Sequence, residues 1–178
     1  MAQVVSYRTV RIILGSISLA ALLFPVRCGN RLFPEQVELN RSWHFQYDPG
    51  NNGMQQRWYS STTSLAGWVT VPGGSYWDKT YDGIGWFARD VRLPELRSDR
   101  SIALVITGAD DRISAWVNDS LVIDRAAGNQ LVYADIATVY QPNRKNRFVI
   151  MVEDTGGAGG LTGDVYIRKY LTPQEIGN

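Results

Sequence analysis

Cysteine and histidine are nearly absent from this sequence of 178 residues. Cys28 is the only cysteine and His44 the only histidine. A single cysteine cannot form a disulfide within the chain, so the fold has to be held by packing alone. A single histidine excludes a histidine-based metal cluster and argues against a serine–histidine–aspartate catalytic site. We therefore expect neither a metal site nor a cofactor.

The sequence also has almost no net charge, because 18 basic residues balance 17 acidic ones and leave a charge of +1. Such a balance creates no field that attracts nucleic acid or an anionic membrane surface. The nearest approach to a basic cluster is Arg144, Lys145 and Arg147, which we interpret as a solvated loop tip. Nucleic acid is therefore not an expected partner.

No apolar run reaches the length of a standard membrane-spanning helix. The longest covers residues 12–26 and follows Arg8 and Arg11. As a helix, ~15 residues cover only ~22 Å, and a positive segment before such a run is typical of a signal peptide. No A-x-A cleavage pattern precedes Cys28, so an uncleaved hydrophobic N-terminal helix that anchors the chain in the inner membrane through residues 10–27 stays open. Both alternatives predict an exported protein, periplasmic or extracellular.

Sustained helical periodicity is missing as well, and the chain shows a series of short β-type runs instead. Gly, Asp, Asn and Pro separate these runs, a pattern typical of an antiparallel β-sandwich. Single helical turns are expected at most at 55–60 and 136–140. The fold class is therefore all-β. The expected strands cover residues 43–47, 68–71, 85–93, 101–107, 113–118, 120–124, 130–135, 146–154 and 164–170.

These runs define one folded domain of a size that can bury a good core. The expected organisation is a signal peptide or anchor at 1–30, a linker at 31–40, the domain at 41–171 and a tail at 172–178. Aromatic residues make up 11% of the chain, with six Trp and nine Tyr, which suits a sandwich core or a sugar-stacking surface. Four aromatic residues are expected in the core. They are Trp43, Phe45, Trp68 and Trp116.

Six segments carry more specific patterns and occur in a fixed order. They are Trp43 to Tyr59, Trp68 to Gly73, Tyr81 to Arg89, Gly108 to Asn118, Tyr133 to Ile136 and Asp154 to Leu161. Between about Leu39 and Tyr170 they resemble the sugar-binding jelly-roll domain of family 2 glycoside hydrolases, the β-galactosidase and β-glucuronidase group. The resemblance implies an antiparallel, galactose-binding-domain-like jelly-roll β-sandwich.

One position departs from the pattern of that family. Where the family has Val-Asn-Gly, this chain has Val117-Asn118-Asp119, so a turn glycine is lost. Aspartate adopts positive φ less readily than glycine but more readily than most residues. We expect a locally altered loop and an unchanged fold.

The resemblance also implies that the chain is not an enzyme by itself. In the family this domain lies beside a catalytic barrel, which supplies the two catalytic glutamates, and lends a few residues to the sugar pocket. Retaining glycosidases need two carboxylates ~5 Å apart on a rigid site. Asp110 and Asp111 are neighbours in a turn, so we expect them to point apart and to accept hydrogen bonds from loop N–H groups.

Sugar recognition would combine aromatic faces with paired hydrogen-bond donors and acceptors. The aromatic residues in or next to glycine-rich loops also have a second interpretation, in which they close one end of the sandwich. Gly156 to Gly160 lack the Lys-Ser/Thr of a phosphate-binding loop, so we expect these glycines to permit positive φ and close packing. The candidate ligand-binding residues are Trp77, Tyr81, Trp86, Arg89, Asp90 and Asn118.

Two functions from different classes follow from these observations. The first is a non-catalytic, exported carbohydrate-binding module of the family 2 type, with a glycan as its partner. The alternative is a membrane-anchored accessory or structural subunit, which uses the domain to contact a larger membrane protein complex. Trp, Tyr and Arg are enriched at protein interfaces too, so composition does not separate the two.

Overall fold

The computed structural model describes residues 35–77, 80–96 and 100–170, and every regular element within these ranges is a β-strand. The predicted N-terminal hydrophobic helix lies outside the described residues. Within the described ranges there is no helix with the length and apolarity needed to cross a bilayer. The strands are β1 (Gln36–Glu38), β2 (Trp43–Tyr47), β3 (Val69–Val71), β4 (Ser75–Tyr76), β5 (Gly83–Arg92), β6 (Ser101–Ile106), β7 (Arg112–Val117), β8 (Ser120–Ala127), β9 (Val132–Asp135), β10 (Lys145–Asp154), β11 (Gly160–Leu161) and β12 (Val165–Tyr170).

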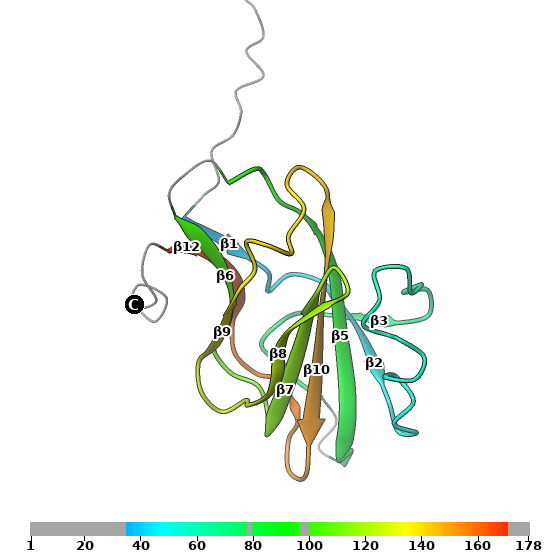
Figure 1. Ribbon diagram of the computed structural model, residues 1–178. Coiled ribbons are helices and arrows are strands. Elements are labelled where there is room, and N and C mark those ends of the chain that lie inside the picture. The colour runs from blue at the N-terminus through cyan, green and yellow to red at the C-terminus, as the bar shows by residue number, and fades with distance from the viewer. Residues whose placement is uncertain (1–34, 78–79, 97–99, 171–178) are drawn as a thin grey trace, which may run out of the picture. The chain divides into compact units, whose positions relative to one another are not determined.

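Two antiparallel sheets form the two layers of the domain (Figure 1). The smaller sheet has the strand order β1-β12-β6-β9, and the larger has the order β3-β2-β5-β10-β7-β8. A further two-stranded sheet pairs β4 with β11. The expected all-β antiparallel sandwich is confirmed.

The main apolar core fills the space between the two layers. Side chains alternate along each strand, so Phe87 and Ile150 join this inner core, whereas Trp86 and Met151 point to the other face of the same sheet. Leu104 contributes to the inner core from the smaller sheet. Burial of such side chains is the main stabilising contribution to a fold that has no disulfide among its described residues.

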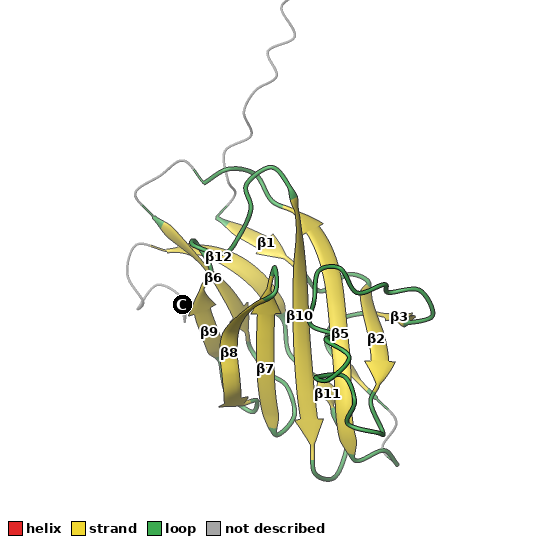
Figure 2. Ribbon diagram, turned by 45° about the vertical axis from the view of Figure 1, so that its right-hand side comes forward, coloured by secondary structure: helices red, strands yellow, loops and turns green. Residues whose placement is uncertain are grey.

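The outer face of the larger sheet is covered by residues 48–68, the connection between β2 and β3, which we call the strap (Figure 2). Its Trp58 ring lies edge-on to Trp86 at 6.0 Å between centroids, and its Tyr59 ring stacks on Trp116 at 5.5 Å. Trp86 and Trp116 in turn stack on each other at 5.5 Å. The strap therefore creates a second, aromatic core on a face that is often solvated in antiparallel sheets.

Two polar contacts fasten the strap to the sheet. The Arg147 guanidinium donates to the carbonyl of Thr63 at 3.1 Å and to the carbonyl of Ser60 at 3.5 Å. The Asp119 carboxylate accepts from Ser61 N and Ser61 Oγ at 2.6 and 2.7 Å. The interpretation of Arg147 as part of a solvated loop tip is therefore wrong: because its side chain points to the face under the strap, it is only 7% exposed.

The main departures from the sequence-based strands are short elements. β1 lies within the segment 31–40 that we interpreted as a linker, and it pairs with β12 at the edge of the smaller sheet. β4 and β11 have two residues each, and such short strands show no alternation that a sequence pattern can reveal. The predicted core positions of Trp43, Phe45 and Trp116 are confirmed, whereas Trp68 is only partly buried because it lies in the strap.

Candidate functional site

The structure distributes the six predicted ligand residues over several parts of the sandwich. We call the edge at which β5 begins and β10 ends the loop end; there Gly83 pairs with Asp154. The loop end brings two of the predicted aromatic residues close to a cluster of carboxylates. Trp77 and Tyr81 belong to the loop end, Trp86 and Asp90 to the outer face of the larger sheet, Arg89 to its inner face, and Asn118 to the β7–β8 turn at the opposite end.

Trp77 is held in place on both its apolar and its polar side. Its indole stacks against Phe45 at 5.8 Å and Phe87 at 6.3 Å between centroids. The indole Nε1 donates to Asp154 Oδ2 at 3.3 Å, and both side chains are almost fully buried. Trp77 therefore joins the inner core to the polar groups of the loop end.

Beside Trp77 lies an aromatic pocket with a volume of about 280 Å³. Two of its walls are solvent-exposed, since Val69 is 57% and Tyr76 65% exposed. Ser75 and two tyrosines supply the polar side-chain atoms of an otherwise apolar lining. The pocket is lined by Phe45, Tyr47, Val69, Val71, Ser75, Tyr76, Trp77 and Phe87.

Tyr81 closes the same end by local hydrogen bonds. Its hydroxyl donates to the Ile84 carbonyl at 3.0 Å and accepts from Ile84 N at 3.2 Å. Its ring packs edge-on against Tyr47 at 4.6 Å. Burial raises the pKa of the Tyr81 hydroxyl. The phenol is thus a neutral group that positions the start of β5.

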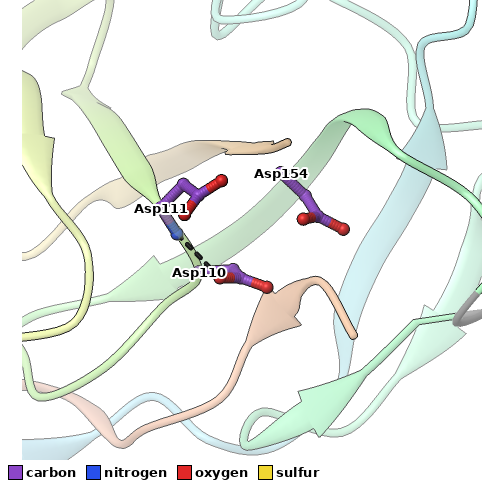
Figure 3. Close-up of side chains that lie close together, drawn as sticks. All are labelled: Asp110, Asp111 and Asp154. Atoms are coloured by element: carbon purple, nitrogen blue, oxygen red, sulfur yellow. Dashed lines mark hydrogen bonds between the residues drawn. The ribbon is translucent and has the colours of Figure 1, made fainter. Parts of the chain in front are cut away.

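Three carboxylates converge at the loop end, from Asp110, Asp111 and Asp154 (Figure 3). One oxygen of each lies within 4.8 Å of the others. The expectation that Asp110 and Asp111 point apart is therefore wrong, because the turn between β6 and β7 bends both toward the end of β10. Their expected acceptor role is confirmed: Asp110 Oδ1 accepts from Asp111 N at 2.9 Å, and Asp111 Oδ2 accepts from Thr155 N at 2.7 Å and from Thr155 Oγ1.

The pKa values of the neighbouring residues Asp110 and Asp111 are shifted in opposite directions. Burial raises the pKa of Asp110, and the charges of Asp154 and Asp111 act in the same direction. Hydrogen bonds from the Thr155 side chain and backbone lower the pKa of Asp111. Among the described residues, no hydrogen bond reaches Asp110 Oδ2 or Asp111 Oδ1, so both oxygens can accept from a ligand.

The glycine-rich segment after β10 connects the aromatic and the acidic side of the loop end. Gly160 has φ 147° and lies so close to the backbone of Ser75 that a Cβ would overlap it. It pairs with Tyr76 of β4, and its carbonyl accepts from Asp110 N at 3.0 Å. A Cβ on Gly159 would overlap the Trp77 ring. The expectation for the glycines of residues 156–160 is thus confirmed in part: φ is positive at Gly156, Gly157 and Gly160, whereas close packing occurs only at Gly159 and Gly160.

Trp86 and Asp90, two further predicted ligand residues, are occupied under the strap. Trp86 is fully buried, and its Nε1 donates to Asp48 Oδ2 at 3.0 Å. Asp90 accepts from Arg147 Nε at 2.6 Å and from Arg147 Nη2 at 3.1 Å, with Lys145 Nζ also at 3.1 Å. Burial opposes the charge of Asp90, but these cationic donors outweigh it and lower its pKa.

Arg89 and Asn118 have internal partners as well. Arg89 donates to the Leu39 carbonyl, and burial lowers the pKa of its guanidinium. The Asn118 amide donates to the Val139 carbonyl at 2.9 Å and to Asn146 Oδ1 at 2.7 Å, and its oxygen accepts from Arg147 N at 3.0 Å. Both side chains support the framework in the free protein, and their ligand-binding role stays a prediction.

The loop end thus offers apolar ring faces next to acidic hydrogen-bond acceptors. Sequence reasoning placed Trp77 and Tyr81 there but omitted Asp154, Tyr47 and Tyr76 from the candidate residues. Tyr47 precedes a turn that contains glycine, as Tyr81 does, and Tyr76 follows such a turn, as Trp77 does. Asp154 stands at the end of a ten-residue strand, directly before the glycine-rich segment, and that position was the available signal.

The sequence and the fold are both similar to β-glucuronidases. A β-glucuronidase from Paenibacillus borealis is 30% identical over 140 residues, which is 75% of this chain. The chain spans only 23% of that relative. No protein-family model matches the sequence. The resemblance seen in the motifs is therefore supported over 75% of this chain, which matches one part of a much longer relative.

Solved structures show the same fold at lower sequence identity. The β-glucuronidase of Ruminococcus gnavus has a TM-score of 0.68 and 20% identity, over 77% of this chain and 29% of that one. A family 2 glycosyl hydrolase from Bacteroides cellulosilyticus has a TM-score of 0.66 and 15% identity, over 76% of this chain and 21% of that one. At these identities the likeness shows the fold. The sandwich described above is thus similar to one part of the family 2 glycoside hydrolases.

Proposed function

We propose, from this similarity to one part of the family 2 glycoside hydrolases, that the chain is a non-catalytic carbohydrate-binding module with the galactose-binding-like jelly-roll topology. The observation that carries the proposal is the loop end, where the aromatic rings around Trp77 lie next to the carboxylates of Asp110 and Asp111. The proposal includes export through the N-terminal segment, as the order of charged and apolar residues in that segment suggests.

The chemistry of the loop end matches what a sugar presents. Carbohydrates have apolar C–H faces that stack on aromatic rings and hydroxyl groups that donate to carboxylate oxygens. Little surface is buried when a short sugar binds such a site. We therefore expect weak affinity, with a Kd in the range ~10 µM to ~1 mM.

The proposed absence of catalysis rests on what glycoside hydrolysis requires. A retaining enzyme uses one carboxylate as acid and base and a second as nucleophile, ~5 Å apart on either side of the glycosidic bond. Asp111 and Asp154 use oxygens to hold Thr155 and Trp77, so two of the three carboxylates at the loop end serve the framework, which supports binding rather than hydrolysis. Chromogenic aryl glycosides are expected to stay intact when incubated with the full chain.

A glycan array followed by titration tests the binding function. The full 178-residue chain is expected to retain a subset of glycans, and Asp110→Asn together with Asp111→Asn is expected to weaken that binding at least fivefold. Tyr133→Ala is the matched control, since Tyr133 is an exposed aromatic residue on β9 of the smaller sheet. A chain that is folded by circular dichroism and retains no glycan contradicts the proposal.

The accessory-subunit function is the second candidate, because the lining of the aromatic pocket is mostly apolar and Val69 and Tyr76 are exposed beside it. Exposed aromatic residues around a pocket are also typical of protein interfaces. Purification from native membranes under mild detergent, with intact mass measurement, separates the two. A full-length chain that co-purifies with a membrane complex supports the subunit, whereas a processed soluble monomer supports the binding module.

A further inference from the structure

We propose that the aromatic pocket is a subsite for an apolar aglycone, so that the preferred ligand is an aryl glycoside of a neutral sugar. This inference rests on the proposed carbohydrate-binding function and names the class of ligand. In the proposed complex the aryl group enters the pocket beside Trp77 and Tyr76, and the sugar lies against Asp110 and Asp111.

The lining of the pocket favours an aryl group over a bare sugar ring. Its floor is made of Phe45, Phe87 and Trp77, and β3 adds Val69 and Val71. The transfer of a hydroxyl group from water into such surroundings without a hydrogen-bond partner is unfavourable. A sugar carries several hydroxyl groups, whereas an aryl ring carries none and gains from burial and from stacking on the pocket rings.

The size of the pocket sets an upper limit on the apolar group. Its volume of about 280 Å³ lies just below the range of about 300–1,000 Å³ that is typical of complete small-molecule sites. A pocket of this size accepts one or two fused rings and leaves the rest of the ligand outside. The polar part of the ligand therefore has to find its partners on the neighbouring surface.

The neighbouring surface supplies acceptors and negative charge. Tyr76 pairs with Gly160, whose carbonyl binds Asp110 N, and the Trp77 indole binds Asp154. Residues that line the pocket therefore bind directly to segments that carry the carboxylates. Carboxylates accept hydrogen bonds from neutral hydroxyl groups, whereas they repel the carboxylate of a uronic acid. The charge of the loop end thus selects a neutral sugar, in contrast to the glucuronides named for the similar enzymes.

The test compares glycosides that differ in one group at a time. Phenyl β-glucoside, methyl β-glucoside and phenyl β-glucuronide, with the corresponding galactosides and free phenol, are titrated into the full chain. Binding is followed by the indole N–H resonance of Trp77. We expect the phenyl glycoside of the recognised neutral sugar to bind about tenfold more tightly than its methyl glycoside, since aryl burial adds apolar contact, and at least tenfold more tightly than phenyl glucuronide and phenol.

Substitutions locate the effect in the pocket. Tyr76→Ala is expected to reduce the phenyl-over-methyl ratio to below about threefold, and Val69→Ala to reduce it in the same direction. Both residues are exposed, so the variants are expected to fold. Tyr133→Ala, which removes an exposed tyrosine from the other sheet, is expected to keep the full ratio.

Each contrary result has a distinct meaning. Equal affinity for phenyl and methyl glycosides overturns the aglycone subsite and leaves the carbohydrate-binding function standing. Phenyl glucuronide binding as tightly as the neutral phenyl glycosides overturns the selection by charge. Failure of every glycoside, and of a glycan array, overturns the proposed function and the subsite with it.

Discussion

At the scale of single residues, the loop end depends on glycines that make room for one large ring. A Cβ on Gly85 would overlap the rings of Trp77 and Phe45, and a Cβ on Gly159 would overlap Trp77. Gly85 lies in the middle of the larger sheet, where β2 and β10 flank β5 on either side. Neither neighbouring strand can move away without breaking its own ladder, so the ring and the strand have no simple means of relaxation.

Gly85→Ala is therefore expected to destabilise the protein by about 2–4 kcal/mol, since overpacking of a dense core displaces side chains and backbone. Urea unfolding of the full chain measures the change in the free energy of unfolding. In a Trp77→Leu background, where the indole is gone, the same substitution is expected to cost about half as much or less. Equal costs in both backgrounds would contradict the role of the ring.

Another residue-scale feature is the turn between β7 and β8, where Asn118 and Asp119 have φ 47° and 73°. At the position of the lost glycine, the Asp119 carboxylate accepts hydrogen bonds from Ser61 of the strap; whether the loop differs from that of the family stays a prediction. Burial opposes the charge of Asp119, but hydrogen bonds from Ser61 outweigh it and lower its pKa. Asp119 thus adopts a positive φ that glycine would favour, and its carboxylate binds the strap at Ser61.

Asp119→Gly is expected to leave the global free energy of unfolding within about 1 kcal/mol of the original, because the relief of positive φ offsets part of the lost hydrogen bonds. Locally, amide hydrogen exchange of strap residues near Ser61 is expected to become at least tenfold faster. Exchange rates in β10, which is central in the larger sheet, serve as the internal control. Unchanged exchange at Ser61 would remove Asp119 from the anchoring of the strap.

At the scale of elements, the strap is held by Arg147, which also forms an ion pair with Asp90 on the sheet beneath it. Two cations approach Asp90, yet they differ in burial: the Arg147 side chain is 7% exposed, whereas the Lys145 side chain is 70% exposed. Arg147 also binds the carbonyls of Ser60 and Thr63. Removal of Arg147 leaves the partly buried Asp90 with only the exposed Lys145 as a cationic partner in this contact, and it takes a donor away from the carbonyls of Ser60 and Thr63.

The two cations therefore make a matched pair of substitutions. Arg147→Met is expected to cost about 2–4 kcal/mol in the free energy of unfolding, below the full cost of breaking a buried pair because Asp90 keeps some exposure. Lys145→Met is expected to cost about 0.5 kcal/mol or less, as usual for an exposed pair. Urea denaturation followed by tryptophan fluorescence measures both. Similar costs for the two variants would contradict the anchoring role of Arg147.

The elements also show why sequence reasoning recovered the long strands and missed the strap. β5 and β10 have ten residues each, and both contain a continuous buried stretch, which leaves a readable run of mostly apolar residues in the sequence. The role of Arg147 depends on Asp90, 57 positions away, and on Ser60, 87 positions away. No local pattern contains such a pairing. The convergence of Asp110 and Asp154 across the loop end is non-local in the same way.

At the scale of the whole molecule, acid stability follows from the aspartates. Hydrogen bonds to charged donors, hydroxyls or backbone N–H groups outweigh burial at Asp90, Asp119 and Asp135. At Asp111, hydrogen bonds from Thr155 outweigh burial and the charge of Arg112 acts in the same direction, so the pKa of each of the four is lowered. A carboxyl whose folded pKa is lowered stabilises the fold fully above its unfolded value, ~3.9, and loses this contribution as the pH falls through the folded pKa. Asp110 acts in the opposite direction, because its pKa is raised.

We therefore expect Tm to be nearly constant between about pH 6 and pH 8 and to fall steeply below about pH 4. Differential scanning calorimetry of the full chain at several pH values measures this dependence. Asp90→Asn is expected to lower Tm at pH 7 and to flatten the fall on acidification. A Tm that rises between pH 5 and pH 3 would contradict the assignment of these carboxylates.

The contacts of the strap also have a consequence for the order of events during synthesis. The residues that bind the strap are synthesised much later than the strap itself. Asp119, the partner of Ser61, follows it by 58 residues, and Arg147, the partner of Ser60, follows it by 87 residues. Trp58, Tyr59 and Trp68 leave the ribosome long before the strands that cover them. At ~5–20 residues per second, these rings stay uncovered for several seconds or longer. The growing chain therefore exposes this aromatic surface until β10 has emerged.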